Sequence, residues 1–201
     1  ERRKFAQRPA LRASAVADGT YMTAFEKYTL DQFPLRDSFR ALKAFFSGDV
    51  LLQRDNNGVY SAEDHLAKLD YPVNTELVRH AAERFSAVYE TYFTGGDANI
   101  YYTVVPDKNY FLAVQNGYPA MDYALLTDTL RGGMPFAEYI DCFGTLSLDK
   151  YYRTDAHWRQ EELGETASAI AAAMDASLPA EYETVDMSVA FRGVYAGQYA
   201  L

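Results

Sequence analysis

The chain has 201 residues, of which 49% are hydrophobic and 23% charged, as expected for one folded domain with a buried core. Its net charge of -9 argues against nucleic acid as a partner, because a polyanion is bound by a basic surface. The single cysteine, Cys142, excludes an internal disulfide and a thiolate metal site.

The N-terminal part predicts a lead-in followed by helices. Residues 1–14 are charged and contain a proline, which favours an extended segment. The sequence then predicts helical pieces that end before Pro34, because proline disrupts the turn that precedes it. A further helix follows, with Asp37 or Ser38 as its cap and Gly48 as its end.

The middle of the chain alternates between strand and helix signals. A turn at residues 55–58 precedes a short strand. Asn74 caps a helix whose apolar residues repeat at helical spacing as far as Tyr92. Residues 99–105 are rich in β-branched and aromatic side chains and predict a buried strand, which runs into a loop at 106–108.

The second half repeats this alternation. A helix is expected from about Pro119 to residues 132–133, and residues 138–143 predict another strand. An amphipathic helix is expected over 163–174. The tail, residues 182–201, alternates enough to predict one or two strands.

Strands that alternate with helices predict an α/β fold with a parallel sheet covered on both faces. We expect one domain over 1–201, with a lead-in and helix over 1–36. Ligands of such folds lie beyond the carboxyl ends of the strands, which directs attention to residues 106–108 and 147–158. The sheet is small for a complete doubly wound domain, so we expect the C-terminal part to be missing.

The segment YYRTDAHWRQ, residues 151–160, carries the clearest chemistry. Asp155 lies one residue from His157, and Trp158, the only tryptophan, follows. One interpretation is structural: Thr154 or Asp155 caps a helix that follows, and the histidine has no role.

Two other interpretations give the pair a chemical role. As metal ligands, Asp155 and His157 need a third partner, and the only other histidines, His65 and His80, stand in no spacing motif. As part of a catalytic triad, His157 is the base that takes the proton of a serine, and Asp155 fixes its tautomer. The residues alone leave all three interpretations open.

The octapeptide YYRTDAHW resembles the signature of the bacterial DHHW family, which is similar to the SGNH hydrolases and related to the alginate O-acetyltransferases. Residues 25–43, 57–60 and 105–108 resemble further segments of that family in the expected order. Together these segments are spread over most of the chain, from residue 25 to residue 158. Ala156 stands where the name-giving pattern has its first histidine, a position that varies among the acetyltransferases.

This resemblance implies an SGNH-like three-layer α/β/α fold and a carbohydrate esterase or O-acyltransferase without cofactor or metal. It implies His157 as the base, Asp155 as its orienter and Trp158 as a wall of the pocket. Asp107 and Lys108 would lie beside the substrate, although for Lys108 a solvated side chain at a strand end is the alternative. The partner would be a carbohydrate or cell-wall glycan.

The resemblance also implies a location outside the cell or in its envelope. A chain that opens on Glu1 with no methionine is expected to be trimmed, with loss of a targeting segment or membrane tether. The sequence predicts no oligomeric state.

The serine of the implied triad is not evident. In the related acetyltransferases it follows the Asp-x-His-Trp block in a Gly-Asp-Ser-like turn, which this sequence lacks. The later serines, Ser168, Ser177 and Ser188, stand in no such turn. We favour a serine beyond Leu201 over a natural half-triad, and in both cases expect the 201-residue chain to be inactive. The alternative function is a non-catalytic envelope module that binds glycan or protein.

Overall fold

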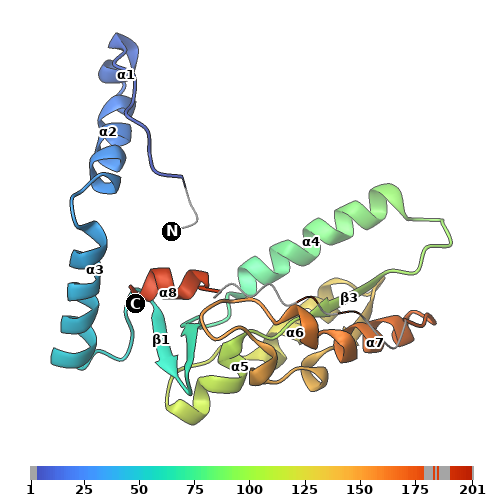
Figure 1. Ribbon diagram of the computed structural model, residues 1–201. Coiled ribbons are helices and arrows are strands. Elements are labelled where there is room, and N and C mark those ends of the chain that lie inside the picture. Colours follow the sequence, from blue (N-terminus) through green and yellow to red (C-terminus); the bar gives the residue numbers. More distant parts are fainter. Residues whose placement is uncertain (1–3, 179–182, 184, 186–190, 201) are drawn as a thin grey trace. The chain divides into compact units, whose positions relative to one another are not determined.

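A computed structural model describes residues 4–178, 183, 185 and 191–200 (Figure 1). The chain divides into two units, one made of Glu1–Asn56 with Tyr199–Leu201 and the other of Asn57–Gln198. The boundary at Asn56 lies beyond the lead-in that the sequence distinguishes, and the single domain stays a prediction.

The first unit is helical in its described part. It contains α1 (Ala13–Ala17), α2 (Thr20–Asp31), α3 (Arg36–Phe45) and a π-helical turn, η1 (Phe46–Val50), that continues α3. The predicted end before Pro34 is confirmed. The lead-in predicted over 1–14 has no helix or strand at residues 4–12, but α1 begins at Ala13, so its last two residues are helical.

The start and end predicted for α3 are also wrong. The helix begins at Arg36 without a side-chain cap, and Leu35 precedes it with a φ of 56°. Asp37 lies inside the first turn, where a negative charge is favourable without capping. The helical path runs past Gly48, because η1 carries it to Val50.

The second unit opens with a β-hairpin. Strand β1 (Val59–Ala62) pairs antiparallel with β2 (His65–Lys68). The first strand confirms the prediction, but the second was missed because Glu63 and Asp64 join the two instead of the usual asparagine or glycine. Both residues have positive φ, 47° and 61°, as a tight two-residue hairpin turn requires.

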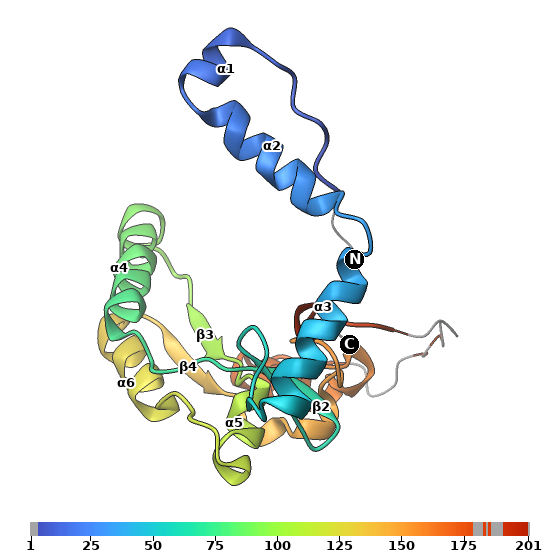
Figure 2. The ribbon, with the colours of Figure 1, turned by 90° about the vertical axis from the view of Figure 1, so that its left-hand side faces the viewer.

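A parallel pair of strands follows. Strand β3 (Tyr101–Val104) pairs with β4 (Glu138–Asp141) in a parallel register. Helix α4 (Thr75–Tyr92) precedes β3, and α6 (Tyr123–Gly133) lies in the connection between the strands. The two helices pack together beside the strands, as Figure 2 shows. The mixed α/β class is therefore confirmed, and the three-layer SGNH arrangement stays a prediction.

Side-chain caps set the starts of both helices. Asn74 accepts a hydrogen bond from the amide of Leu77 at 3.1 Å, which confirms the predicted cap of α4. Asp122 accepts from the amide of Leu125 at 2.9 Å. This cap places the start of α6 after Asp122, later than the expected start near Pro119.

The other described helical elements of the second half are α5 (Lys108–Leu112), η2 (Val114–Asn116), η3 (Phe143–Thr145), η4 (Leu148–Lys150), η5 (Gln160–Glu162), α7 (Gly164–Ala173) and α8 (Val194–Tyr199). The last residue of α8, Tyr199, is assigned to the first unit. Helix α7 confirms the predicted amphipathic helix. The strands predicted over 182–201 are wrong at Val194–Tyr199, which are helical. Most of the tail before α8 lies outside the described residues.

The buried core beside the hairpin is partly aromatic. Tyr60, Ala67 and Leu112 form a buried cluster. The ring of Tyr60 stacks on that of Tyr118, with 3.9 Å between centroids, and its hydroxyl donates to Asn109 Oδ1 at 2.7 Å. The hairpin and α5 therefore share one core, which holds the start of α5 next to β1 and β2.

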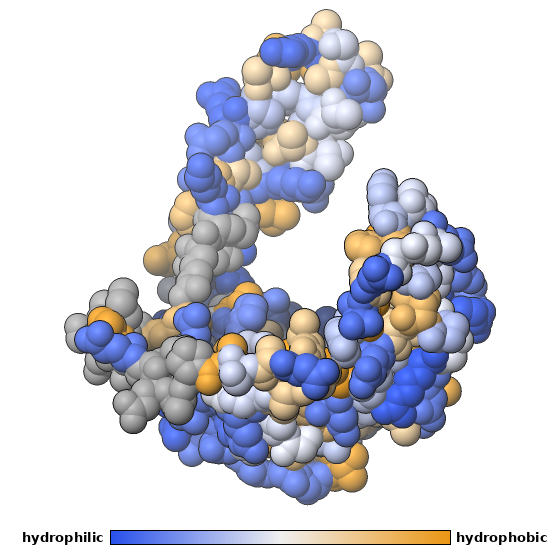
Figure 3. Space-filling model, turned by 90° about the vertical axis from the view of Figure 1, so that its right-hand side faces the viewer, coloured by the Kyte–Doolittle hydropathy of each residue, from blue (hydrophilic) through white to orange (hydrophobic). Residues whose placement is uncertain are grey.

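Helix α4 buries only part of its apolar surface. Ala82 is buried, and the ring of Tyr89 stacks on Phe136 with 4.3 Å between centroids. Other apolar side chains at helical spacing are exposed: Leu77, Phe85, Val88 and Tyr92. Figure 3 shows apolar side chains (orange) among polar ones (blue) over the face that it displays. Among the described residues, no helix is sufficiently long and apolar to cross a membrane.

We expect Gly133→Ala to destabilise the packing of α6 on α4. A Cβ atom at Gly133 would lie 2.6 Å from the Cβ of Ala82, and overpacking of this kind costs about 1–3 kcal/mol. Gly132→Ala is the matched control, because nothing lies within 4 Å of its added Cβ. Urea unfolding curves measure the difference, and equal midpoints for the two variants would contradict this packing.

Candidate functional site

The loop that carries Asp155 and His157 is a closed turn in the second unit. Tyr151 and Trp158 face each other in an isolated antiparallel bridge at its base. The hydroxyl of Tyr151 donates a hydrogen bond to the carbonyl of Pro106. The structure therefore brings together the two loops that the sequence indicated.

Asp155 and His157 are joined side chain to side chain. His157 Nδ1 lies 2.5 Å from Asp155 Oδ1, and the same oxygen accepts the backbone amide of His157 at 3.2 Å. The Asp155 side chain is 6% exposed, whereas that of His157 is 79% exposed. The pair thus joins a buried carboxylate to an imidazole that solvent reaches.

The carboxyl group of Asp155 is ionised at neutral pH. Burial acts to raise its pKa, but hydrogen bonds from the Val194 amide (2.8 Å, to Oδ2) and from His157 outweigh burial and lower the pKa below its ordinary value. An ionised carboxylate only accepts hydrogen bonds, so the shared proton lies on His157 Nδ1. In the neutral ring this leaves Nε2 as a proton acceptor, the form that a general base needs.

Helix capping does not account for Asp155. The residues after it form turns, and the next helical element, η5, begins only at Gln160. The carboxylate instead accepts the amide of Val194, which is 39 positions away in the sequence. The interpretation of Thr154 or Asp155 as the cap of a following helix is therefore wrong.

The other two histidines lie apart from any metal-binding cluster. His65 lies in β2, with Nδ1 2.9 Å from the carbonyl oxygen of Glu63. His80 lies on α4, with Nδ1 3.7 Å from a carboxylate oxygen of Glu83. In the part of the chain that the structure describes, no three histidine, cysteine, aspartate or glutamate side chains could jointly hold a metal ion.

The side chain of Lys108 supports the loop that carries Asp155 and His157. It is only 2% exposed, and its Nζ donates to the carbonyls of Tyr152 (3.0 Å) and Arg153 (3.2 Å). Nζ also lies 5.2 Å from the ring centroid of Tyr195. Burial lowers the pKa of Lys108 to about 8, against the opposing effect of the Asp155 charge. These bonds give Lys108 a structural role, and the alternative of a solvated lysine is wrong.

Asp107 also serves the local structure. It caps α5 through the amide of Tyr110 (3.4 Å) and accepts a hydrogen bond from the hydroxyl of Tyr123. Helix α5 therefore begins at Lys108, the last residue of the loop predicted over 106–108. Burial raises the pKa of Asp107, although the Tyr123 bond opposes this shift. The contacts of Asp107 and the half-buried Trp158 with a substrate stay predictions.

Sequence reasoning missed residues 193–195 as part of the site. The Gly193 amide donates to Thr154 Oγ1 at 2.9 Å, and the Tyr195 amide donates to the Thr154 carbonyl at 3.0 Å. With the bond from Val194 to Asp155, three consecutive amides bind two consecutive residues. The only signal in the sequence is a glycine before an apolar and an aromatic residue, which is too common to identify such a contact.

No serine is placed beside the imidazole in the described residues. Ser168 is exposed within α7, and Ser177 is exposed beyond its end. Ser188 lies outside the described residues. No described side chain forms a hydrogen bond with His157 Nε2, so the described residues place no hydroxyl nucleophile on the imidazole.

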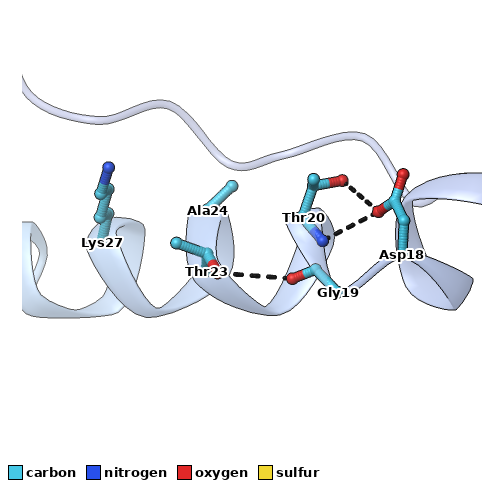
Figure 4. Close-up of a pocket in the computed structure, with 6 residues that line it drawn as sticks. All are labelled: Asp18, Gly19, Thr20, Thr23, Ala24 and Lys27. Carbon is cyan, nitrogen blue, oxygen red and sulfur yellow. Dashed lines mark hydrogen bonds between the residues drawn. The ribbon is translucent and has the colours of Figure 1, made fainter.

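The first unit has a surface hollow of its own. Figure 4 shows the side chains that line it, on and before α2: Asp18, Gly19, Thr20, Thr23, Ala24 and Lys27. The Asp18 carboxylate accepts the Thr20 amide at 2.9 Å and the Thr20 hydroxyl at 2.6 Å. These bonds stabilise the start of α2, and the hollow contains none of the predicted site residues.

A scan against protein-family models, a search of curated proteins and a search of solved structures found no match to this chain. The resemblance to the DHHW family therefore rests on its sequence motifs. The geometry around Asp155 and His157 is the basis for a functional proposal.

The lowered pKa of Lys108 predicts how stability depends on pH. From about pH 8 to pH 10 the folded chain releases this proton while the unfolded chain, with a lysine pKa of 10.5, retains it. The unfolded state then binds more protons, so the free energy of unfolding should rise with pH over this range. Above pH 10 the trend reverses, because burial raises the pKa of Tyr195 to about 12.

Urea unfolding at several pH values tests this dependence. Lys108→Met should flatten the curve between pH 8 and pH 10, because it removes the titrating group. Lys68→Met, at a half-exposed position in β2, should leave the rise in place. A rise that persists in Lys108→Met would show that another group causes it.

Proposed function

We propose that this protein is an acyl-ester hydrolase or O-acyltransferase that acts on carbohydrate of the bacterial cell envelope. The observation that carries the proposal is the buried, ionised Asp155 bonded to Nδ1 of the exposed His157. The substrate class and the location follow from the resemblance to the DHHW family alone.

In the proposed reaction, His157 Nε2 takes the proton of a serine hydroxyl while the serine oxygen attacks the acyl carbonyl carbon. The protonated imidazole then gives that proton to the leaving alcohol, and the acyl group stays on the serine. Water or a sugar hydroxyl removes the acyl group in a second step, again with His157 as the base. Asp155 holds the tautomer and stabilises the imidazolium, as in other triads.

The geometry around His157 favours this chemistry over an incidental histidine. An incidental surface histidine needs no buried carboxylate behind it, and burying a charge is costly unless donors replace water. Here both oxygens of Asp155 are bonded, and one of them is aimed at the imidazole. The nucleophilic hydroxyl must come within about 2.6–3.2 Å of Nε2, the edge that solvent reaches.

A non-catalytic module that binds glycan or protein is the second candidate. It is favoured by the absence, among the described residues, of a hydroxyl bonded to His157 Nε2. A glycan-binding protein that is inert towards esters would support this candidate. In that protein Asp155→Asn would leave glycan binding unchanged.

We expect the complete gene product to release acetate from acetylated oligosaccharides and from p-nitrophenyl acetate. Asp155→Asn should lower kcat by about 10²–10⁴-fold, because an amide that donates to Nδ1 places the ring proton on Nε2, where it blocks the base. His157→Ala should lower kcat at least as much. Initial rates at saturating substrate measure both effects.

His80→Ala is the matched control, because His80 is an exposed histidine on α4. It should keep the wild-type rate. The enzyme proposal fails if the wild-type protein is inert on these esters, or if His157→Ala hydrolyses them as fast as wild type.

A further inference from the structure

We infer that Gly193, Val194 and Tyr195 form a positioning strap that fixes Asp155 for its work on His157. The strap is defined as these three residues. Its catalytic meaning rests on the proposed function, while its contacts with the loop stand on the geometry alone.

The strap binds the loop through three consecutive backbone amides. Gly193 and Tyr195 donate to the side chain and the carbonyl of Thr154, at 2.9 and 3.0 Å. Val194 donates to Asp155 Oδ2 at 2.8 Å. Hydrogen bonds from the strap thus hold both the residue before the carboxylate and the carboxylate itself.

The Val194 bond restricts rotation of the carboxylate. Asp155 Oδ1 faces the imidazole and the amide of His157, while Oδ2 faces Val194. Rotation of the carboxylate away from Nδ1 would break the hydrogen bond of Oδ1 with His157 and that of Oδ2 with Val194. Because Asp155 is also buried, loss of either donor would leave a carboxylate oxygen with little access to solvent, which is costly.

Gly193 is required for this close approach. A Cβ atom at this position would lie 2.3 Å from the Thr154 carbonyl oxygen and 2.5 Å from the Cβ of Asp155. Both atoms belong to the loop that carries the dyad of Asp155 and His157, and neither is the mobile end of a long side chain. Only glycine lets the strap backbone come so near. Gly197, in helix α8, which begins at Val194, has nothing within 4 Å of an added Cβ.

Further contacts flank the strap and converge on the same loop. The ring of Phe191, just before the strap, lies 4.7 Å from that of Tyr152 between centroids. The ring of Tyr195 faces the ammonium of Lys108, which holds the carbonyls of Tyr152 and Arg153. Lys108 and the strap therefore hold the loop together. If the strap loosens, we expect Asp155 to be displaced before the rest of the loop.

The test is the tautomer of His157, read from ¹⁵N chemical shifts of the imidazole ring at a pH where the ring is neutral. In wild type we expect the proton on Nδ1 and a free Nε2. Gly193→Ala should displace Thr154 and Asp155 and give a mixture with the Nε2-protonated form. Gly197→Ala should keep the wild-type pattern. His80 serves as an internal reference, because it is an exposed histidine on α4 beside Glu83.

A second variant keeps the test decisive if Gly193→Ala fails to fold. Thr154→Val removes the hydroxyl that accepts the Gly193 amide and adds no bulk beside the strap. It should shift the tautomer in the same direction. In the complete gene product, both variants should lower kcat with little change in KM, by up to about 10²-fold as for other misplaced catalytic groups.

The possible results distinguish the positioning role of the strap from the proposed enzymatic function. If the folded variants keep the Nδ1 proton and the wild-type kcat, the strap has no positioning role and the dyad remains. If wild type itself lacks the Nδ1 proton, the oriented dyad fails, and the inference about the strap fails with it. A wild-type dyad with the expected tautomer and no esterase activity would overturn the proposed function but leave the strap's effect on the tautomer intact.

Discussion

A carboxylate that leaves water keeps its charge only where hydrogen-bond donors replace the water molecules it loses. Asp155 meets this condition with the amide of Val194 on one oxygen and the amide and ring of His157 on the other. Two of these donors lie within the loop, but the third comes from far along the chain. The hydrogen bond from Val194 to Asp155 therefore joins the C-terminal part of the second unit to the loop that carries Asp155.

Lys108 is the cationic counterpart of this buried carboxylate. Its ammonium is satisfied mainly by the carbonyls of Tyr152 and Arg153, and its pKa is lowered because these dipoles replace water incompletely. The arrangement thus uses one buried cation and one buried anion to fix a short stretch of backbone. The imidazole of His157 is the exposed group that this stretch presents. In the proposed function, such placement of the base before the reaction is the preorganisation that general-base catalysis requires.

Several of the predictions that succeeded depend on contacts between near neighbours in the sequence. The cap of α4 at Asn74 is one such case, because the side chain binds an amide three residues away. The predictions that failed are those for segments whose local sequence pattern is compatible with two different structures. Glu63 and Asp64 hold a hairpin turn without the usual residues, and Asp107, read as part of a loop, caps a helix. The tail reads as strand, yet Val194 to Tyr199 are helical.

The sequence by itself determined that Asp155 and His157 lie within reach of each other, and it left the role of the pair open. Two residues separated by one position lie within reach of a hydrogen bond in a tight turn, so this contact is local. Only the tertiary structure decided that Asp155 is buried, that Val194 binds its second oxygen and that Lys108 supports the loop instead of facing solvent. These properties depend on segments 39 to 45 positions apart coming together, and no local pattern encodes such contacts.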